Sequence, residues 1–223
     1  MIAATSGRKQ ILILDSAGAA FAEHGYEGAS MSAITRVAGV SKATVYAHFP
    51  SKAELFGAYV QRECERNLKH VFDAIPTGQG LADTLREIGL RMVGLMLSPT
   101  GLTMDRIMVS EAGAFPELAQ AFFAAGPARG IGTMAAWLRT QVKAGSLSVE
   151  DPDFAAEQFF TLCQTQVVMR RRLRLPDALP PGAVERVVDA AVHMFLATYS
   201  APGLKQVGGA GAPRKTTSGA RGR

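Results

Sequence analysis

Apolar side chains recur every three to four positions along most of the chain, which is the spacing of one buried face of an α-helix. In the first third, this pattern predicts helices over residues 8–24, 30–38, 41–48 and 51–74. Ser30, Ser41 and Ser51 begin three of these helices, where a serine hydroxyl accepts free backbone N–H groups. Gly25 and Gly39 follow two of them and supply stops. Two short helices joined by a tight turn are therefore expected, with a supporting helix on each side.

The apolar positions also predict which face of each helix is buried. The first helix should bury Ile11, Leu14, Ala17 and Phe21, and the second Met31, Ile34, Val37 and Ala38. In the third helix, Val45 and Phe49 lie one turn apart and should anchor it to the first two. Ser51 and Glu54 have the spacing of a capping box at the start of the fourth.

Beyond a break at residues 76–80, Gly and Pro punctuate six further helical stretches: 81–97, 102–113, 115–125, 128–145, 152–172 and 183–199. We therefore predict an all-α fold. It should have an N-terminal domain over residues 1–75, which includes the start of the connecting helix, and a helical C-terminal domain over residues 76–202. Residues 203–223 contain almost no bulky apolar side chain and are predicted to be a disordered basic tail.

Charge changes this picture little. The net charge is +5 in 223 residues, and residues 201–223 carry five basic and no acidic side chains. The tail alone therefore accounts for the excess, so the high isoelectric point does not indicate that the folded part binds nucleic acid. The tail could add non-specific DNA affinity by counterion release, or have no role.

The two cysteines, Cys64 and Cys163, lie far apart and favour neither a disulfide scaffold nor a zinc site. Residues 1–7 lack the pattern of a signal peptide, and the longest apolar runs are too short to cross a bilayer. A cytoplasmic protein that makes no membrane contact is expected.

The most informative segment runs from Ala38 to Lys52 and reads Ala-Gly-Val-Ser-Lys-Ala-Thr-Val-Tyr-Ala-His-Phe-Pro-Ser-Lys. It resembles the signature of the TetR (tetracycline-repressor-like) family, and residues 21–26 and 30–34 resemble it as well. Phe115 to Leu118 are reminiscent of a subgroup with an AefR-like C-terminal domain. The resemblance implies a helix-turn-helix DNA-binding domain, followed by a helical domain that binds a ligand and dimerises.

The residue types in this segment suit contact with double-stranded DNA. Ala43 and Ala47 are small and point away from the core, so the third helix can approach base edges closely. Lys42 lies at the helix N-terminus, where it can reach guanine acceptors, and Ser32 lies at the start of the preceding helix. The resemblance implies base reading by Ser32, Lys42 and Ala43, and phosphate contacts by Thr44, Tyr46, His48 and Lys52.

Each of these residues also has a structural interpretation. Tyr46 could be a half-buried wedge between helices, His48 a surface residue and Lys52 an ordinary helix charge. The joint spacing favours DNA contact for the segment as a whole.

Methionine and aromatic side chains are concentrated over residues 81–170 and are interrupted by few charges. Flexible, polarizable side chains can line a cavity for a small hydrophobic effector, although each of them could equally be ordinary core. The candidate ligand-binding residues are Met92, Met96, Met104, Met108, Phe123, Met134, Trp137, Phe160 and Gln164.

The last two predicted helices carry broad apolar stripes, which could pair across a two-fold axis into a four-helix bundle or form ordinary core. The candidate dimer-interface residues are Ala155, Phe159, Leu162, Gln166, Val184, Val188, Ala191, Phe195 and Tyr199. A two-fold dimer would place two recognition helices on one face of a palindromic operator.

Nothing in the sequence favours an enzyme, and no catalytic residue, metal site or cofactor is predicted. The four histidines are scattered, no phosphate-binding glycine loop occurs, and Glu63 and Glu65 are expected on a solvated helix face. The run from Arg170 to Arg174 suits a helix C-terminus, or else an anionic ligand or partner. The expected function is that of a repressor released from its operator by a ligand. A ligand-independent regulator, an activator and a protein-binding module are the alternatives.

Overall fold

The computed structural model describes residues 2–72, 78–175 and 179–202, and side chains from Gly7 onward. Over these residues the chain forms ten helices and no strand, with one isolated bridge between Leu147 and Ser200. The helices are α1 (Ile2–Gly28), α2 (Met31–Ala38), α3 (Lys42–His48), α4 (Lys52–Phe72), α5 (Leu81–Leu97), α6 (Pro99–Glu111), α7 (Pro116–Ala125), α8 (Pro127–Lys143), α9 (Pro152–Arg172) and α10 (Ala183–Tyr199). The predicted all-α fold is confirmed. The predicted break at residues 76–80 lies partly outside the described residues, and the predicted tail at residues 203–223 lies wholly outside them.

Serine caps define the N-terminal helices as the sequence predicts. The hydroxyl of Ser30 accepts the N–H of Ala33, and that of Ser41 accepts the N–H of Thr44, both at 3.1 Å. Ser51 accepts the N–H of Glu54 at 3.1 Å and starts α4. In the turn between α2 and α3, Gly39 has φ 63°, a left-handed conformation that suits glycine. Gly25, with φ 72°, interrupts α1 near its end in the same way.

A serine cap also explains why α6 begins earlier than predicted. The Ser98 hydroxyl accepts the N–H of Gly101 at 3.0 Å, and Pro99 occupies the first helical position, where its missing N–H costs nothing. The stretch expected to be a loop is therefore the first turn of α6.

The buried side chains form two separate clusters. The cluster that we call the recognition core joins α1–α4 with α6 and α7. Its members include Phe21, Ile34, Val45, Phe49, Phe56, Met104, Ile107, Met108 and Leu118. The cluster that we call the C-terminal core joins the end of α4 with α5, α8, α9 and α10. Its members include Ile88, Met92, Met134, Leu138, Phe159, Cys163, Val188 and Phe195.

Three predictions about burial are wrong. Ile11 is 54% exposed and Val37 63% exposed, whereas Ile13 is fully buried. Residues 11–14 are all apolar, so periodicity alone cannot select the buried pair on that turn. Glu63 was expected in solvent but is only 4% exposed, and it lies between the guanidinium groups of Arg62 and Arg66 at 3.3 and 2.5 Å.

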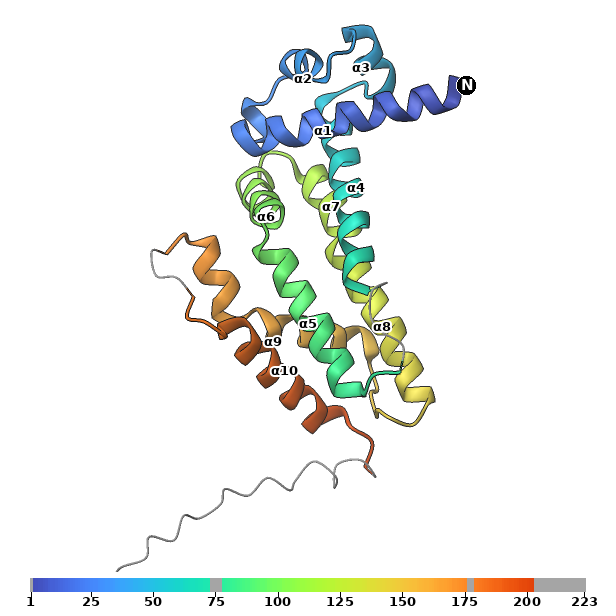
Figure 1. Cartoon of the computed structure of the whole chain (residues 1–223), viewed down its shortest axis with the longest axis vertical. Coiled ribbons are helices and arrows are strands. Elements are labelled where there is room, and N and C mark those ends of the chain that lie inside the picture. Colours follow the sequence, from blue (N-terminus) through green and yellow to red (C-terminus); the bar gives the residue numbers. More distant parts are fainter. Residues whose placement is uncertain (1, 73–77, 176–178, 203–223) are drawn as a thin grey trace, which may run out of the picture.

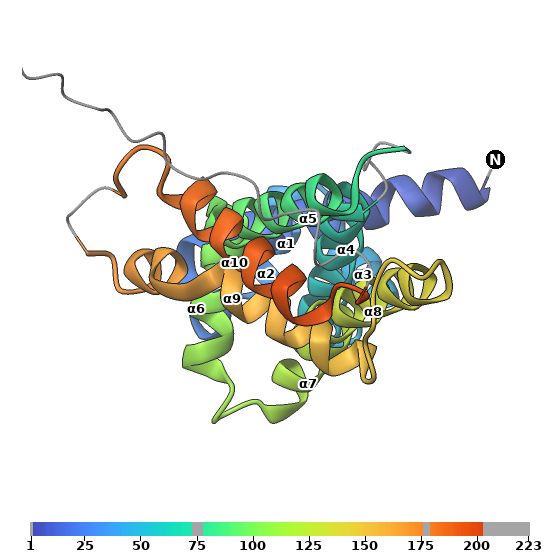
Figure 2. The ribbon, with the colours of Figure 1, turned by 90° about the horizontal axis from the view of Figure 1, so that it is seen from below.

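Helix α4 runs from the α1–α3 unit down to the C-terminal helices and links the two parts of the molecule (Figure 1). Helices α9 and α10 lie side by side at the edge of the C-terminal part, and the view from below shows α10 with no helix covering it (Figure 2). Helix α9 is interrupted at Thr165, which has φ 27° and ψ −132°. Among the described helices, none is long and apolar enough to cross a bilayer.

Candidate nucleic-acid interface

The short helix α3 has one buried and one exposed face. Val45 is fully buried and Phe49, just after the helix, is nearly so, which fixes α3 to the recognition core. Lys42, Ala43, Tyr46 and Ala47 are exposed on the opposite side. The Lys42 ammonium lies 5.8 Å from the centroid of the Tyr46 ring. The anchored helix thus offers a small-residue surface bordered by a cation and a phenol hydroxyl.

Two polar residues flank this face and are half-buried. The Thr44 hydroxyl lies 2.8 Å from the Ser41 hydroxyl, which orients it at the helix N-terminus. His48 is the last residue of α3, and its ring centroid lies 6.2 Å from that of Phe49. On α2, Ser32 is exposed. The structure therefore brings six of the seven candidate DNA-binding residues to the surface formed by α2 and α3.

Lys52 is placed differently from the other six. Its ammonium donates to the carbonyls of Tyr26, Glu27 and Ala29 at 2.9, 3.1 and 3.2 Å. It also lies 4.5 Å from the centroid of the Tyr26 ring. An ammonium has three donors, and all three are used inside the protein. This geometry ties the end of α1 and the residue after it to the start of α4, so Lys52 acts here by holding the recognition unit together.

Sequence analysis missed Arg36 on α2. Arg36 is exposed and lies four residues after Ser32, so both side chains occupy the same helix face. The i, i+4 spacing of Ser32 and Arg36 is the sequence signal that identifies it. Arg36 adds a cation to the surface formed by α2 and α3.

Two models of known protein families match this chain. The model described as bacterial regulatory proteins, tetR family, matches residues 13–59. The model described as the C-terminal domain of AefR-like transcriptional repressors matches residues 83–201, which is more than half of the chain. The chain belongs to the TetR family. The family's members are transcriptional regulators and not enzymes.

Similar solved structures cover nearly the whole described chain. A TetR-family regulator from Mesorhizobium loti is 28% identical with a TM-score of 0.80, over 87% of this chain and 98% of that one. The Flavonoid-responsive Regulator FrrA is 34% identical with a TM-score of 0.76 over the same shares. These neighbours confirm a helix-turn-helix domain followed by a helical domain.

The curated relatives match about a third of this chain. The activator FasR from Mycolicibacterium smegmatis is 41% identical over 70 residues, which is 31% of each chain. The repressor AcnR from Corynebacterium diphtheriae is 33% identical over 76 residues, 34% of this chain and 37% of that one. The match thus spans about a third of the length of these relatives, and they include both activators and repressors.

The candidate ligand residues do not form one site. Met92, Met134 and Phe160 are buried in the C-terminal core, where Met96 and Trp137 pack against them. Gln164 is half-buried, and its amide donates to the Phe160 carbonyl at 3.2 Å. Three other members require correction, because Met104 and Met108 belong to the recognition core and Phe123 is 57% exposed. The apolar residues of both cores recur at the same helical spacing, so the sequence pattern does not show to which core a given methionine belongs.

The candidate dimer residues are mostly internal, which corrects their expected place between subunits. The side chains buried within the single chain are Ala155, Phe159, Val188, Ala191 and Phe195. Leu162, Val184 and Tyr199 are half-buried, and Gln166 is exposed. Helices α9 and α10 use their main apolar stripes to pack on each other and on α5, because the same pattern serves a core within a subunit and one between subunits.

The two parts of the molecule meet through specific contacts. The Tyr26 and Phe115 rings are 4.9 Å apart, and the Arg106 guanidinium donates to the Ala22 carbonyl at 3.3 Å. Burial, and secondarily Glu117 and Glu111, raises the pKa of Tyr26. A displacement of α6 or α7 would therefore act directly on α1, which supports the recognition helix.

Proposed function

We propose that this protein binds a palindromic operator as a homodimer and represses transcription in the cytoplasm until a small hydrophobic effector binds. The observation that carries the proposal is the anchored α3. Its buried Val45 and Phe49 hold Lys42, Ala43 and Tyr46 outward on a helix narrow enough for the major groove. Thr44 and His48 then border the reading face and suit phosphate oxygens.

The DNA proposal is tested by selecting bound sequences from a random library with the full chain and then titrating the selected site. Lys42→Ala should relax sequence preference and cost ~1–3 kcal/mol of specific binding. Tyr46→Phe should weaken binding to the selected site and to related sites alike, because a phosphate contact carries no base information. Lys143→Ala, an exposed change at the end of α8, is the control. An unchanged selection profile for Lys42→Ala would remove its base-reading role.

The proposed dimer forms through the outer faces of α9 and α10. Phe154 on α9 and Met194 on α10 are 54% and 53% exposed, although both are large and apolar. The TetR-family membership supports a dimer. Phe154→Glu combined with Met194→Glu should shift micromolar protein to monomer in sedimentation, whereas Val109→Glu on α6 should not. A stable dimer in the double variant would locate the interface elsewhere.

The proposed effector binds near the Met92, Met134 and Phe160 cluster of the C-terminal core. The name of the relative FrrA, which is flavonoid-responsive, supports a flat, largely apolar ligand. An effector releases DNA only if it binds the released state more tightly than the DNA-bound state. Compounds that raise the melting temperature should therefore also weaken operator binding. Hits that stabilise the protein but leave operator affinity unchanged would favour ligand-independent regulation.

Activation remains the alternative to repression, and the relative FasR, a named activator, is the observation that favours it. A reporter gene placed behind the selected operator separates the two. Repression predicts higher expression when the regulator is deleted, and activation predicts lower expression.

A further inference from the structure

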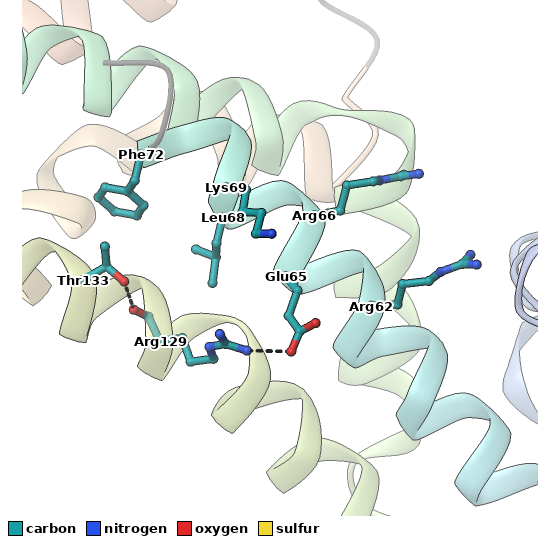
Figure 3. A pocket seen from close by; sticks show the side chains of 8 residues that line it. All are labelled: Arg62, Glu65, Arg66, Leu68, Lys69, Phe72, Arg129 and Thr133. Atoms are coloured by element: carbon teal, nitrogen blue, oxygen red, sulfur yellow. Dashed lines mark hydrogen bonds and ion pairs between the residues drawn. The ribbon is translucent and has the colours of Figure 1, made fainter. Parts of the chain in front are cut away.

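A hollow of about 590 Å³ lies between α4 and α8, near the lower end of α4 (Figure 3). Its lining residues are Arg62, Glu65, Arg66, Leu68, Lys69, Phe72, Arg129 and Thr133. None of these belongs to the predicted ligand set. The hollow is far along α4 from α3, so it is separate from the nucleic-acid interface (Figure 1).

The charges that face the hollow are unequal. Figure 3 shows Glu65, Lys69 and Arg129 on the side where α4 faces α8, whereas Arg62 and Arg66 point away from α8. The Arg129 guanidinium donates to Glu65 at 2.9 Å, and Lys69 has no ion-pair partner among the described residues. Two cations thus stand against one carboxylate, which leaves a single positive charge for a ligand.

The two arginines that point away are already neutralised. Arg62 pairs with Asp15 at 2.8 Å and with Glu63, and Arg66 pairs with Glu63. They therefore add little attraction for a second anionic group. The site suits one negative charge better than a polyanion such as nucleic acid or a nucleotide phosphate chain.

Apolar surface lies next to the cations. Leu68 and Phe72 are half-buried and project from α4 toward α8 (Figure 3). On α8, the exposed Thr133 lines the hollow. Gly130 lies under it, and a Cβ atom there would lie 3.3 Å from the Leu68 side chain, so the helices are closely packed at this point. A ring or short aliphatic body can cover Leu68 and Phe72 while its head group reaches Lys69 and Arg129.

We propose that this hollow binds a small organic monoanion, a carboxylate or sulfonate joined to an aromatic or aliphatic body. The anion pairs with Lys69 and displaces Glu65 from the Arg129 guanidinium. Its binding therefore breaks the Arg129–Glu65 ion pair, which joins α8 to α4. The site is distinct from the hydrophobic effector site proposed above, and its binding does not depend on the DNA assignment.

Two matched fluorescent probes test the charge requirement on the full chain. 1-Anilinonaphthalene-8-sulfonate is an aromatic monoanion, and N-phenyl-1-naphthylamine has the same rings without the sulfonate. The Lys69→Gln, Arg129→Gln double variant should raise the Kd for the sulfonate at least about tenfold and leave the Kd for the neutral amine within about twofold. Arg139→Gln is the control, because Arg139 lies on the same helix and pairs with Asp153 outside the hollow.

A gain of affinity provides a readout that damage to the fold cannot imitate. Glu65→Gln removes the carboxylate that competes for Arg129, so it should lower the Kd for the sulfonate several-fold. Circular dichroism melts confirm that each variant is folded. The proposal is overturned if the double variant binds the sulfonate as wild type does, if Arg139→Gln weakens it equally, or if Glu65→Gln fails to tighten it.

Discussion

Helices α3 and α9 show two ways in which this chain uses a helix. Helix α3 has seven residues, buries Val45, and leaves small and polar side chains on the outside. Helix α9 has 21 residues, buries seven of them within the subunit, and still leaves Phe154 and Met169 more than half exposed. The outer face of α3 carries the small and polar side chains of the DNA contact proposed above. The outer face of α9 carries large apolar side chains, which the proposed dimer would cover.

The recognition core is not confined to the DNA-binding unit. Met104, Ile107 and Met108 of α6 and Leu118 of α7 are buried in it beside Phe21 and Phe56. The C-terminal core, by contrast, draws only the end of α4 from the N-terminal part. Helices α6 and α7 therefore belong to the C-terminal domain by sequence and to the recognition unit by packing, so a displacement of either helix would reach α1 directly.

The largest expected effect comes from the shared core. Phe56 is fully buried, and its ring lies 4.8 Å from that of Phe21 and 5.1 Å from that of Tyr26. Phe56→Ala should lower the free energy of unfolding by ~3–5 kcal/mol in urea titrations. Phe123→Ala, at an exposed site on α7, should change it by less than ~0.5 kcal/mol. Because α6 and α7 share this core, fluorescence of Trp137 on α8 and helix content should report one transition. Two well-separated transitions would show that the cores are independent.

A smaller effect distinguishes the two roles of Lys52. Lys52→Met keeps the aliphatic stem but removes the three hydrogen bonds to carbonyls at the end of α1 and just after it, so it should cost ~1–3 kcal/mol of stability. Lys42→Met, at an exposed and unbonded site, should alter stability by less than ~0.5 kcal/mol and weaken DNA binding. If Lys52→Met weakened DNA binding without lowering the melting temperature, Lys52 would be a phosphate contact and not a clamp.

Local signals made most of the fold predictable. Ser30, Ser41 and Ser51 cap the helices that they were expected to start, and Gly39 takes the left-handed turn between α2 and α3. These interactions span three or four residues, so the sequence contains them directly. The surface formed by α2 and α3 follows from the same local order, because burying Val45 and Phe49 determines which residues point outward.

The parts that were not predictable depend on contacts between distant segments. The Arg62–Asp15 pair spans 47 residues and the Arg129–Glu65 pair spans 64, and no spacing rule connects them. The same limit applies to Met104 and Met108, which have the helical spacing of a pocket wall but are buried in the recognition core, where α6 packs on α1. The helix pattern identifies an apolar face and leaves its partner undecided.

Two glycines on α5 test how tightly the C-terminal core is packed. A Cβ at Gly89 would lie 2.8 Å from the Val188 side chain and 3.2 Å from the Cys163 sulfur, whereas a Cβ at Gly94 would meet nothing within 4 Å. Gly89→Ala should therefore lower the free energy of unfolding by ~1–2 kcal/mol, since overpacking outweighs the gain in helix propensity. Gly94→Ala should raise the free energy of unfolding by up to ~1 kcal/mol. Thermal melts measure both, and stabilisation by Gly89→Ala would mean that the α5–α9–α10 junction is loosely packed.

The smallest effect uses the two thiols as separate reporters, because Cys64 packs against the recognition core and Cys163 lies inside the C-terminal core. Burial raises the pKa of Cys64 to about 11 and that of Cys163 to about 12, so both thiols are protonated and unreactive at neutral pH. Iodoacetamide should modify Cys64 first, by local opening, and both thiols in denatured protein. Above about pH 9 the two thiols ionise in the unfolded chain but stay protonated in the folded one, so the free energy of unfolding should fall as the pH rises. This fall, measured from each protein's value at pH 7, should be smaller in Cys163→Ala than in the wild type. Modification of Cys163 before Cys64, read by mass spectrometry, would show that the C-terminal core opens more readily than the recognition core.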